Sequence, residues 1–236
     1  MHLFHQPDTS LNYLPEQESL HAIKVLRLQV GDEIVILDGK GTYHRAKITL
    51  VHPKRCEFEI VESTFNFDKK PYNLHVAIAP TKNIDRLEWF IEKAVEIGID
   101  EITLLRCQFS ERKNVNFEHL QKIIIAAAKQ SVRVYFPQLN PICTFEEFIR
   151  QDDLQAESQT KLIAHCYQEE RQILKSAIAD KKHVLILIGP EGDFSKEEVA
   201  LALANGFIPV SLGSARLRTE TAGVMACATA AVVLGS

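Results

Sequence analysis

The sequence predicts a small β-barrel or β-sandwich followed by an α/β domain with a parallel sheet. Two observations lead to this fold class. Up to about residue 70, short runs rich in β-forming residues are separated by turn signals. From Tyr72 onward, apolar strand-like runs alternate with helical patterns, which is typical of a parallel sheet covered by helices on both faces. The predicted domains are residues 1–70 and residues 71–236.

The first domain is predicted to contain three strands, which cover residues 33–37, 42–51 and 56–62. Residues 38–41 have the sequence DGKG, which signals a hairpin turn between the first two strands. Pro53 separates the second strand from the third, because proline cannot donate a backbone hydrogen bond to a sheet. Residues 65–71, which end in two lysines and a proline, are predicted to form a linker.

The second domain is predicted to alternate strands and helices. The expected strands cover residues 74–79, 101–105, 161–165, 184–188 and 207–212. The expected helices cover residues 84–97, 117–130, 169–179, 196–204 and 221–234. Asn83 and Gly98 are the expected ends of the first helix, and Ser195 with Glu198 has the spacing of a capping box.

The composition is that of an ordinary globular protein, with 46% hydrophobic and 25% charged residues. The net charge of −4 excludes a globally basic nucleic-acid-binding domain, but it leaves room for a local basic patch. A chain of 236 residues can bury enough apolar surface to fold without disulfides or a structural metal.

Several features indicate a cytoplasmic protein. The first ten residues lack the basic and apolar segments of a signal peptide. The longest uncharged stretch, residues 221–236, is too short for a membrane span. The five cysteines are scattered and form no CxxC pair, which is typical of free thiols in a reducing compartment. The nine histidines are scattered too, so no metal site is expected.

The first candidate site is the loop LIGPEGDFS, residues 187–195, which follows a buried strand. Open α/β proteins bind ligands at such strand ends, and Gly189 and Gly192 would let a ligand approach the backbone closely. The alternative is a tight turn between a strand and a helix, without a ligand. The spacing excludes both a Walker loop and a GxGxxG dinucleotide-binding loop.

The second candidate site, residues 211–222, also lies between a strand and a helix. Its small residues carry Arg216, Arg218 and Glu220 close together, as the polar groups of a site would be. The alternative is a helix start with a surface ion pair. The helix that follows has no polar face, so we expect it to be buried against the sheet or against a second subunit.

Two further segments bring polar and basic residues together. Lys82 and Arg86 stand at the start of one predicted helix, and Gln130 and Arg133 stand near the end of another. Taken alone, each segment is also explained as a solvated helix surface.

Five motifs occur in a specific order along the chain: HxxKVLRxxxGDxIxxxDGxG, KxxDRxE…KAxExG, AxxQSxR, GPEG and LGxxxLRTETA. In this order they resemble the ribosomal RNA small subunit methyltransferase E family, which belongs to the knotted SPOUT methyltransferase superfamily. The resemblance covers nearly the whole chain.

The resemblance implies a trefoil knot in the second domain and a PUA-like barrel that helps to bind RNA in the first. It implies S-adenosylmethionine as the cofactor, no metal, and a homodimer as the active form. The reaction would be methylation of N3 of uridine 1498 in the 16S rRNA of the small ribosomal subunit.

The resemblance also assigns roles to residues of the two loops. The cofactor-binding residues would be Leu187, Ile188, Gly189, Pro190, Glu191, Gly192, Leu212, Gly213, Leu217, Arg218, Thr219, Thr221 and Ala222. The RNA-binding residues would be Lys24, Arg27, Lys82, Arg86 and Arg133. From residue type and loop position, Glu220 or Glu191 would remove the proton from uracil N3, and Arg218 would stabilise the resulting charge.

This chain departs from the family pattern at a few positions. Asp193 stands where the family commonly has a second glycine, and its carboxylate would either approach the sulfonium or face water. Arg216 replaces an aliphatic residue, and the early arginine usual in the family is absent. The alternative functions are another SPOUT activity on tRNA or rRNA (ribose 2′-O or base N1), a non-catalytic ribosome-assembly factor, or a small-molecule α/β enzyme.

Overall fold

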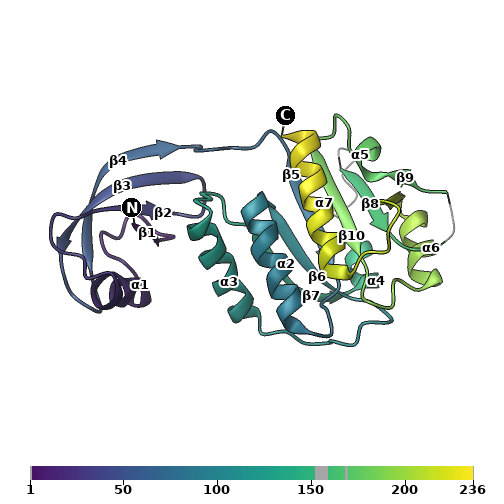
Figure 1. The fold of residues 1–236 in the computed structure, drawn as a ribbon, viewed down its shortest axis with the longest axis horizontal. Coiled ribbons are helices and arrows are strands. Elements are labelled where there is room, and N and C mark those ends of the chain that lie inside the picture. Colours follow the sequence, from purple (N-terminus) through teal and green to yellow (C-terminus); the bar gives the residue numbers. More distant parts are fainter. Residues whose placement is uncertain (1, 152–158, 168–169, 236) are drawn as a thin grey trace. The chain divides into compact units, whose positions relative to one another are not determined.

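The computed structural model describes residues 2–151, 159–167 and 170–235 (Figure 1). The chain forms two compact units. The first consists of Met1–Lys69 and Ile125–Phe136, and the second of Lys70–Ile124 and Pro137–Ser236. A short segment from the middle of the chain therefore packs with the N-terminal residues.

The first unit is built on a four-stranded sheet in the order β1-β2-β3-β4. The strands are β1 (His2–His5), β2 (Glu33–Leu37), β3 (Thr42–Leu50) and β4 (Glu57–Phe65). β1 pairs in parallel with β2, and the other neighbours are antiparallel. Two short helical segments, α1 (Glu16–Leu20) and η1 (His21–Val25), contribute to the same unit. The three expected strands are confirmed, whereas β1 was not predicted because four residues carry too little pattern.

The DGKG turn is held by the side chain of Asp38. Its Oδ1 accepts hydrogen bonds from the backbone N–H groups of Lys40, at 2.7 Å, and Thr42, at 2.9 Å. Burial raises the pKa of the Asp38 carboxyl, but these hydrogen bonds outweigh that effect and bring the pKa below its usual value. Gly41 has φ +108°, and a Cβ there would lie 2.3 Å from the ring of Tyr135, so only glycine fits.

The second unit contains a seven-stranded sheet in the order β7-β6-β5-β10-β8-β11-β9, in which every neighbouring pair is parallel. The strands are β5 (Asn73–Ile78), β6 (Glu101–Arg106), β7 (Gln138–Thr144), β8 (Thr160–Ala164), β9 (Gln172–Ile173), β10 (His183–Ile188) and β11 (Ile208–Ser211). The helices along this part of the chain are α2 (Ile84–Ile97), α3 (Phe117–Gln130), α4 (Phe145–Ile149), α5 (Leu174–Ala177), α6 (Lys196–Ala204) and α7 (Thr219–Leu234).

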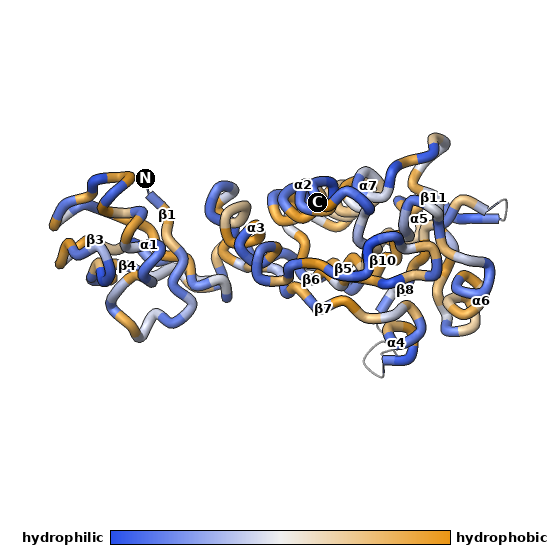
Figure 2. Tube along the Cα trace, turned by 90° about the horizontal axis from the view of Figure 1, so that it is seen from below, coloured by the Kyte–Doolittle hydropathy of each residue, from blue (hydrophilic) through white to orange (hydrophobic). Residues whose placement is uncertain are grey.

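Helices cover both faces of this sheet, as the sequence predicts. Leu185 and Leu187 of β10 belong to a core cluster with residues of α4 and α6. On the opposite face, α2 and α7 lie side by side (Figure 1), and α7 is mostly hydrophobic along its length (Figure 2). A Cβ on Gly223 of α7 would lie 2.5 Å from the ring of Phe90 in α2, so glycine permits this close approach.

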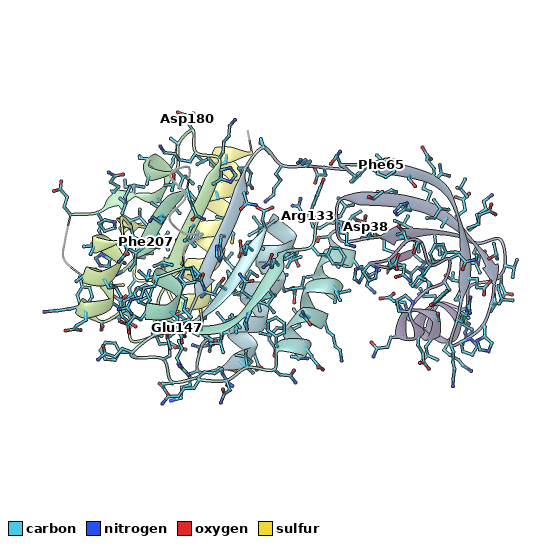
Figure 3. All side chains as sticks on the ribbon, turned by 180° about the vertical axis from the view of Figure 1, so that it is seen from behind. Asp38, Phe65, Arg133, Glu147, Asp180 and Phe207 are labelled. Atoms are coloured by element: carbon cyan, nitrogen blue, oxygen red, sulfur yellow. The ribbon has the colours of Figure 1, made fainter. Side chains whose placement is uncertain are left out.

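The predicted ends of α2 and the predicted start of α6 are confirmed, whereas α7 begins two residues earlier than predicted. The Asn83 side chain accepts a hydrogen bond from the Asp85 N–H at the start of α2, and Gly98 ends the helix in a left-handed conformation. Ser195 and Glu198 form the expected capping box of α6. A second capping box, between Thr144 and Glu147, begins α4, a helix that was not predicted. Glu147 is labelled in Figure 3.

The prediction of a helix over residues 169–179 is wrong where the structure describes that segment; residue 169 lies outside the described residues. Gln172–Ile173 instead forms β9, which pairs with Val210 and Ser211 of β11, and the helix shrinks to α5. Sheet pairing overrides the local helical pattern here, and the β-branched Ile173 favours a strand. The strand β7 was also missed, because it contains Pro141, and proline argues against a strand. The strand accommodates this proline because β7 lies at the edge of the sheet and its pairing with β6 is irregular there.

Replacing Asp38 by alanine is expected to lower the free energy of unfolding by about 2 kcal/mol at pH 7, because two N–H groups lose a charged acceptor. The folded-state pKa of Asp38 lies below the unfolded-state value of about 3.9, so this stabilisation is present above that value and is lost as the pH falls through the folded pKa. Urea unfolding at pH 7 and at about pH 3 measures the difference. Glu62→Ala is the control, since its exposed carboxylate only pairs with Arg45. If the difference in unfolding free energy between Asp38→Ala and the wild type were as large at about pH 3 as at pH 7, the stabilising role of the ionised Asp38 carboxylate would be contradicted.

Candidate cofactor and RNA site

A pocket of about 280 Å³ lies at the carboxyl ends of β8 and β10 and beside the loop that leads into α7. Its lining residues come from three segments: Ala164 and Cys166; Ile188, Gly189, Pro190, Glu191 and Asp193; and Arg216, Leu217, Arg218, Thr219 and Ala222. The pocket therefore lies where a parallel α/β sheet binds its ligands. Both loops singled out from the sequence contribute to its lining.

One buried hydrogen bond ties the two loops together. The Thr219 hydroxyl, in the first turn of α7, donates to the carbonyl oxygen of Gly189 at 3.0 Å. Gly189 is packed tightly, since a Cβ there would lie 3.1 Å from the ring of Phe194. The GPEG loop is thus fixed on one side by α7 and on the other by an aromatic side chain.

Asp193 anchors the other end of the same loop. Its φ of +67° is left-handed, a conformation that aspartate tolerates better than most residues. Oδ2 accepts a hydrogen bond from the Cys166 N–H at 2.8 Å, and Oδ1 accepts one from the Phe194 N–H at 2.8 Å. The carboxylate therefore joins the loop to the end of β8. Burial, followed by the charge of Asp193, raises the pKa of the Cys166 thiol.

Arg216 and Arg218 place two positive charges on the pocket wall. Both side chains are exposed, and among the described residues neither takes part in a salt bridge. Their N–H groups are available to an anionic or carbonyl-bearing ligand. The apolar part of the wall is supplied by Ile188, Leu217 and Ala222.

The two candidate bases have different surroundings. Glu191 lines the pocket, is exposed, and accepts a hydrogen bond from the Lys82 N–H at 2.9 Å through Oε1. Glu220 is only 7% exposed and does not line the pocket. Its Oε1 lies 3.8 Å from Nε of Arg86, and its buried Oε2 has no hydrogen-bond partner within the described part of the chain.

The structure thus brings two predicted RNA-binding residues to the two glutamates: Lys82 to Glu191 and Arg86 to Glu220. The side chain of Lys82 also pairs with Glu111 at 2.8 Å, and this hydrogen bond and charge raise the pKa of Lys82. The other three predicted RNA-binding residues belong to the first unit. Lys24 and Arg27 are exposed there, and Arg133 is bonded to Asp68 at 3.1 Å.

Eight of the predicted cofactor-binding residues line the pocket: Ile188, Gly189, Pro190, Glu191, Leu217, Arg218, Thr219 and Ala222. Five do not: Leu187, Gly192, Leu212, Gly213 and Thr221. Leu187 points into the core on the side of α4 and α6, and a Cβ on Gly192 would lie 3.0 Å from Phe109. Sequence reasoning missed Ala164 and Cys166, although Ala164 lies near the end of the predicted strand 161–165 and Cys166 directly follows it, at the edge where a ligand would bind.

The described residues contain no group of three or more His, Cys, Asp or Glu side chains that could hold a metal ion. In the same described ranges, no helix has the length and apolar character needed to cross a bilayer.

Comparison with protein families supports the assignment of both units. Residues 68–231 match the RNA methyltransferase domain family, and residues 14–61 match the RNA methyltransferase PUA domain family. The chain therefore contains an RNA methyltransferase domain and an RNA methyltransferase PUA domain.

Individual relatives and solved structures show which RNA methyltransferase family this is. A ribosomal RNA small subunit methyltransferase E from Rickettsia conorii is 31% identical over 222 residues, which cover 91% of this chain and 87% of that protein. The crystal structure of a probable rRNA methyltransferase from Porphyromonas gingivalis matches with a TM-score of 0.91 at 38% identity, covering 99% of this chain and 98% of that chain. The Neisseria gonorrhoeae ribosomal RNA small subunit methyltransferase E, bound to S-adenosylmethionine, matches with a TM-score of 0.86 at 28% identity, covering 100% and 98%. The chain belongs to the ribosomal RNA small subunit methyltransferase E family.

Thr219→Val is expected to lower the free energy of unfolding by about 1–3 kcal/mol, because it leaves the buried Gly189 carbonyl without its donor. Thr229→Val is the matched control on the same helix, since the Thr229 hydroxyl bonds only to the carbonyl of Met225 within an exposed turn. Thermal and urea unfolding of both variants measure the difference. Equal stability of the two variants would show that the bond between the loops contributes nothing.

Proposed function

We propose that this protein transfers a methyl group from S-adenosylmethionine to N3 of uridine 1498 in the 16S rRNA of the small ribosomal subunit. The observation that carries the proposal is the pocket, which two predicted loops line with two arginines and two carboxylates. Family membership and the S-adenosylmethionine bound to the Neisseria gonorrhoeae relative support it.

The residues of the pocket fit this cofactor. Ile188, Leu217 and Ala222 supply apolar contact suited to an adenine ring, and Gly189 allows close approach to the backbone. The carboxylate of Glu191 complements the positive charges of the cofactor. When bound, S-adenosylmethionine supplies a methyl group that its positive sulfur already activates.

The chain's own task is to make uracil N3 nucleophilic and to position it. Uracil N3 carries a proton at neutral pH, so a carboxylate within reach would speed the reaction by taking that proton. We assign this role to Glu191, because it lines the pocket and its second carboxylate oxygen has no partner among the described residues. Arg218, which also lines the pocket, would stabilise the negative charge that spreads onto O2 and O4 of the uracil. Glu220 then has a positioning role, because its carboxylate is buried beside Arg86.

RNA binding would use both units. Lys82 and Arg86 lie beside the pocket loops and can contact phosphates near the target base. The exposed Lys24 and Arg27 would contribute from the PUA domain. The same proposal includes a cytoplasmic homodimer with a trefoil knot at the cofactor loops, and the exposed Met225 and Val232 of α7 are suited to a subunit interface.

The direct test is methyl transfer from S-adenosylmethionine to small ribosomal subunits that lack the modification, followed by nucleoside mass spectrometry and mapping of the site. We expect N3-methyluridine at one position. A different methylated nucleoside would move the protein to a sister activity on RNA. Absence of transfer to both subunits and free rRNA, in a protein that still binds the cofactor, would contradict the proposal.

Glu191→Gln and Arg218→Ala are each expected to lower kcat by about 10²–10³-fold, because each removes a group that acts mainly in the transition state. Glu191→Gln should leave the KM for RNA within about threefold, since the amide keeps the shape and the contact with the Lys82 N–H. Steady-state kinetics at saturating cofactor measure both values. Glu220→Gln separates the two carboxylates: if it removed activity while Glu191→Gln kept it, the roles would be reversed.

A further inference from the structure

We propose that Arg112 is a positioning residue that holds the backbone of Thr81 and Lys82 so that the Lys82 N–H keeps Glu191 in place. Arg112 belongs to the connection between β6 and α3 and does not line the cofactor pocket. This inference rests on the proposed role of Glu191 for its kinetic consequence, but its structural part can be tested separately.

A single guanidinium binds two successive carbonyl groups at this point. Nε of Arg112 donates to the carbonyl oxygen of Thr81 at 3.0 Å, and Nη2 donates to the carbonyl oxygen of Lys82 at 2.7 Å. The planar guanidinium presents several N–H groups in fixed directions, so it can bind two neighbouring acceptors at once. A lysine ammonium is a point charge without this fixed geometry, so it cannot reproduce both bonds in the same way.

These carbonyls belong to a segment that must be held in a defined conformation. Thr81 is fully buried, and its hydroxyl donates to the carbonyl of Asn83 at 2.6 Å. Asn83 in turn caps α2. Among the described residues, Arg112 is the donor to the Thr81 carbonyl, and a buried carbonyl that loses its donor is costly. Loss of the guanidinium would therefore favour a rearrangement of the segment between β5 and α2.

The same segment carries the contact that reaches the pocket. The Lys82 N–H donates to Oε1 of Glu191 at 2.9 Å. This N–H and the Thr81 carbonyl belong to one peptide group, so Arg112 holds the same peptide that orients the carboxylate. The salt bridge between the Lys82 side chain and Glu111 cannot replace the hydrogen bonds from Arg112 to this segment. Both of its side chains are more than half exposed, and exposed pairs contribute about 0–1 kcal/mol.

Arg112 could instead act only as a positive charge that attracts RNA phosphates, and this alternative predicts different mutant behaviour. Under the positioning role, Arg112→Lys should lose about tenfold or more in kcat, as Arg112→Ala does, while the KM for RNA stays within about threefold. Lys113→Ala, which removes a charge from the exposed neighbour, is the matched control and should keep the wild-type kcat. Wild-type kcat in Arg112→Lys, or a change confined to KM, would overturn the proposal.

A double-mutant comparison tests whether the effect passes through Glu191. If it does, Arg112→Lys should lower kcat by less than about twofold in a Glu191→Gln background, because the group it positions is already absent. Independent, multiplicative effects of the two substitutions would overturn the proposed connection.

Hydrogen exchange supplies a readout that does not depend on catalysis. The Lys82 amide should exchange about tenfold faster or more in Arg112→Lys than in the wild type, while amides of the first unit keep their protection. Exchange of Lys82 at the wild-type rate would overturn the proposal even if Arg112→Ala fails to fold. Faster exchange in Arg112→Lys, combined with a wild-type protein that methylates no RNA, would support the positioning contact and reject the proposed function instead.

Discussion

The parallel direction of all seven strands in the second unit is the constraint on which the rest of its structure depends. Because the strands run the same way, the segments after β5, β8, β10 and β11 all leave at one edge of the sheet. Four segments thus meet there although they lie far apart in the sequence: residues 81–86, 164–166, 188–193 and 216–222. Hydrogen bonds from Thr219, Lys82 and the Cys166 N–H then connect these segments directly.

Several of these connections use backbone groups as one partner, which limits how the site can be altered. The carbonyl of Gly189 and the N–H groups of Lys82 and Cys166 exist whatever side chain stands at those positions. The variable partners are Thr219, Glu191 and Asp193. Asp193 is notable because it adopts a left-handed conformation that costs a non-glycine residue free energy, yet its carboxylate gains two backbone donors. The side chain contributes a link that a glycine in the same conformation would lack.

Much of the fold could be predicted from the sequence, because the deciding signals were local. Asn83, Gly98 and the Ser195–Glu198 pair mark helix ends through contacts within a few residues, and α3 was predicted at its observed bounds. The errors lie in segments whose structure depends on pairing with strands far away in the sequence. β9 exists because Gln172 and Ile173 pair with β11, and β7 tolerates Pro141 because it lies at an edge.

In the candidate site, too, residues in local motifs could be predicted and residues brought in by strand order could not. The two glycine-bearing loops could be recognised by their position after predicted strands, and eight of the cofactor-binding residues predicted in them line the pocket. Ala164 and Cys166 carry no motif, since their part in the pocket follows from strand order, which the sequence does not display. Arg112 was not singled out either, because its partners are carbonyl groups about 30 residues away.

The segment Ile125–Phe136 gives the first unit a part of its core from outside the N-terminal residues. Val134 packs with Val35 and Leu37, and Lys129 pairs with Glu18 at 2.6 Å. A fragment ending at Lys69 would leave two core side chains of β2 exposed to water and Glu18 without its cation. The first unit is therefore not formed by the N-terminal residues alone. Gene fusion or domain exchange at residue 70 would have to carry this segment along.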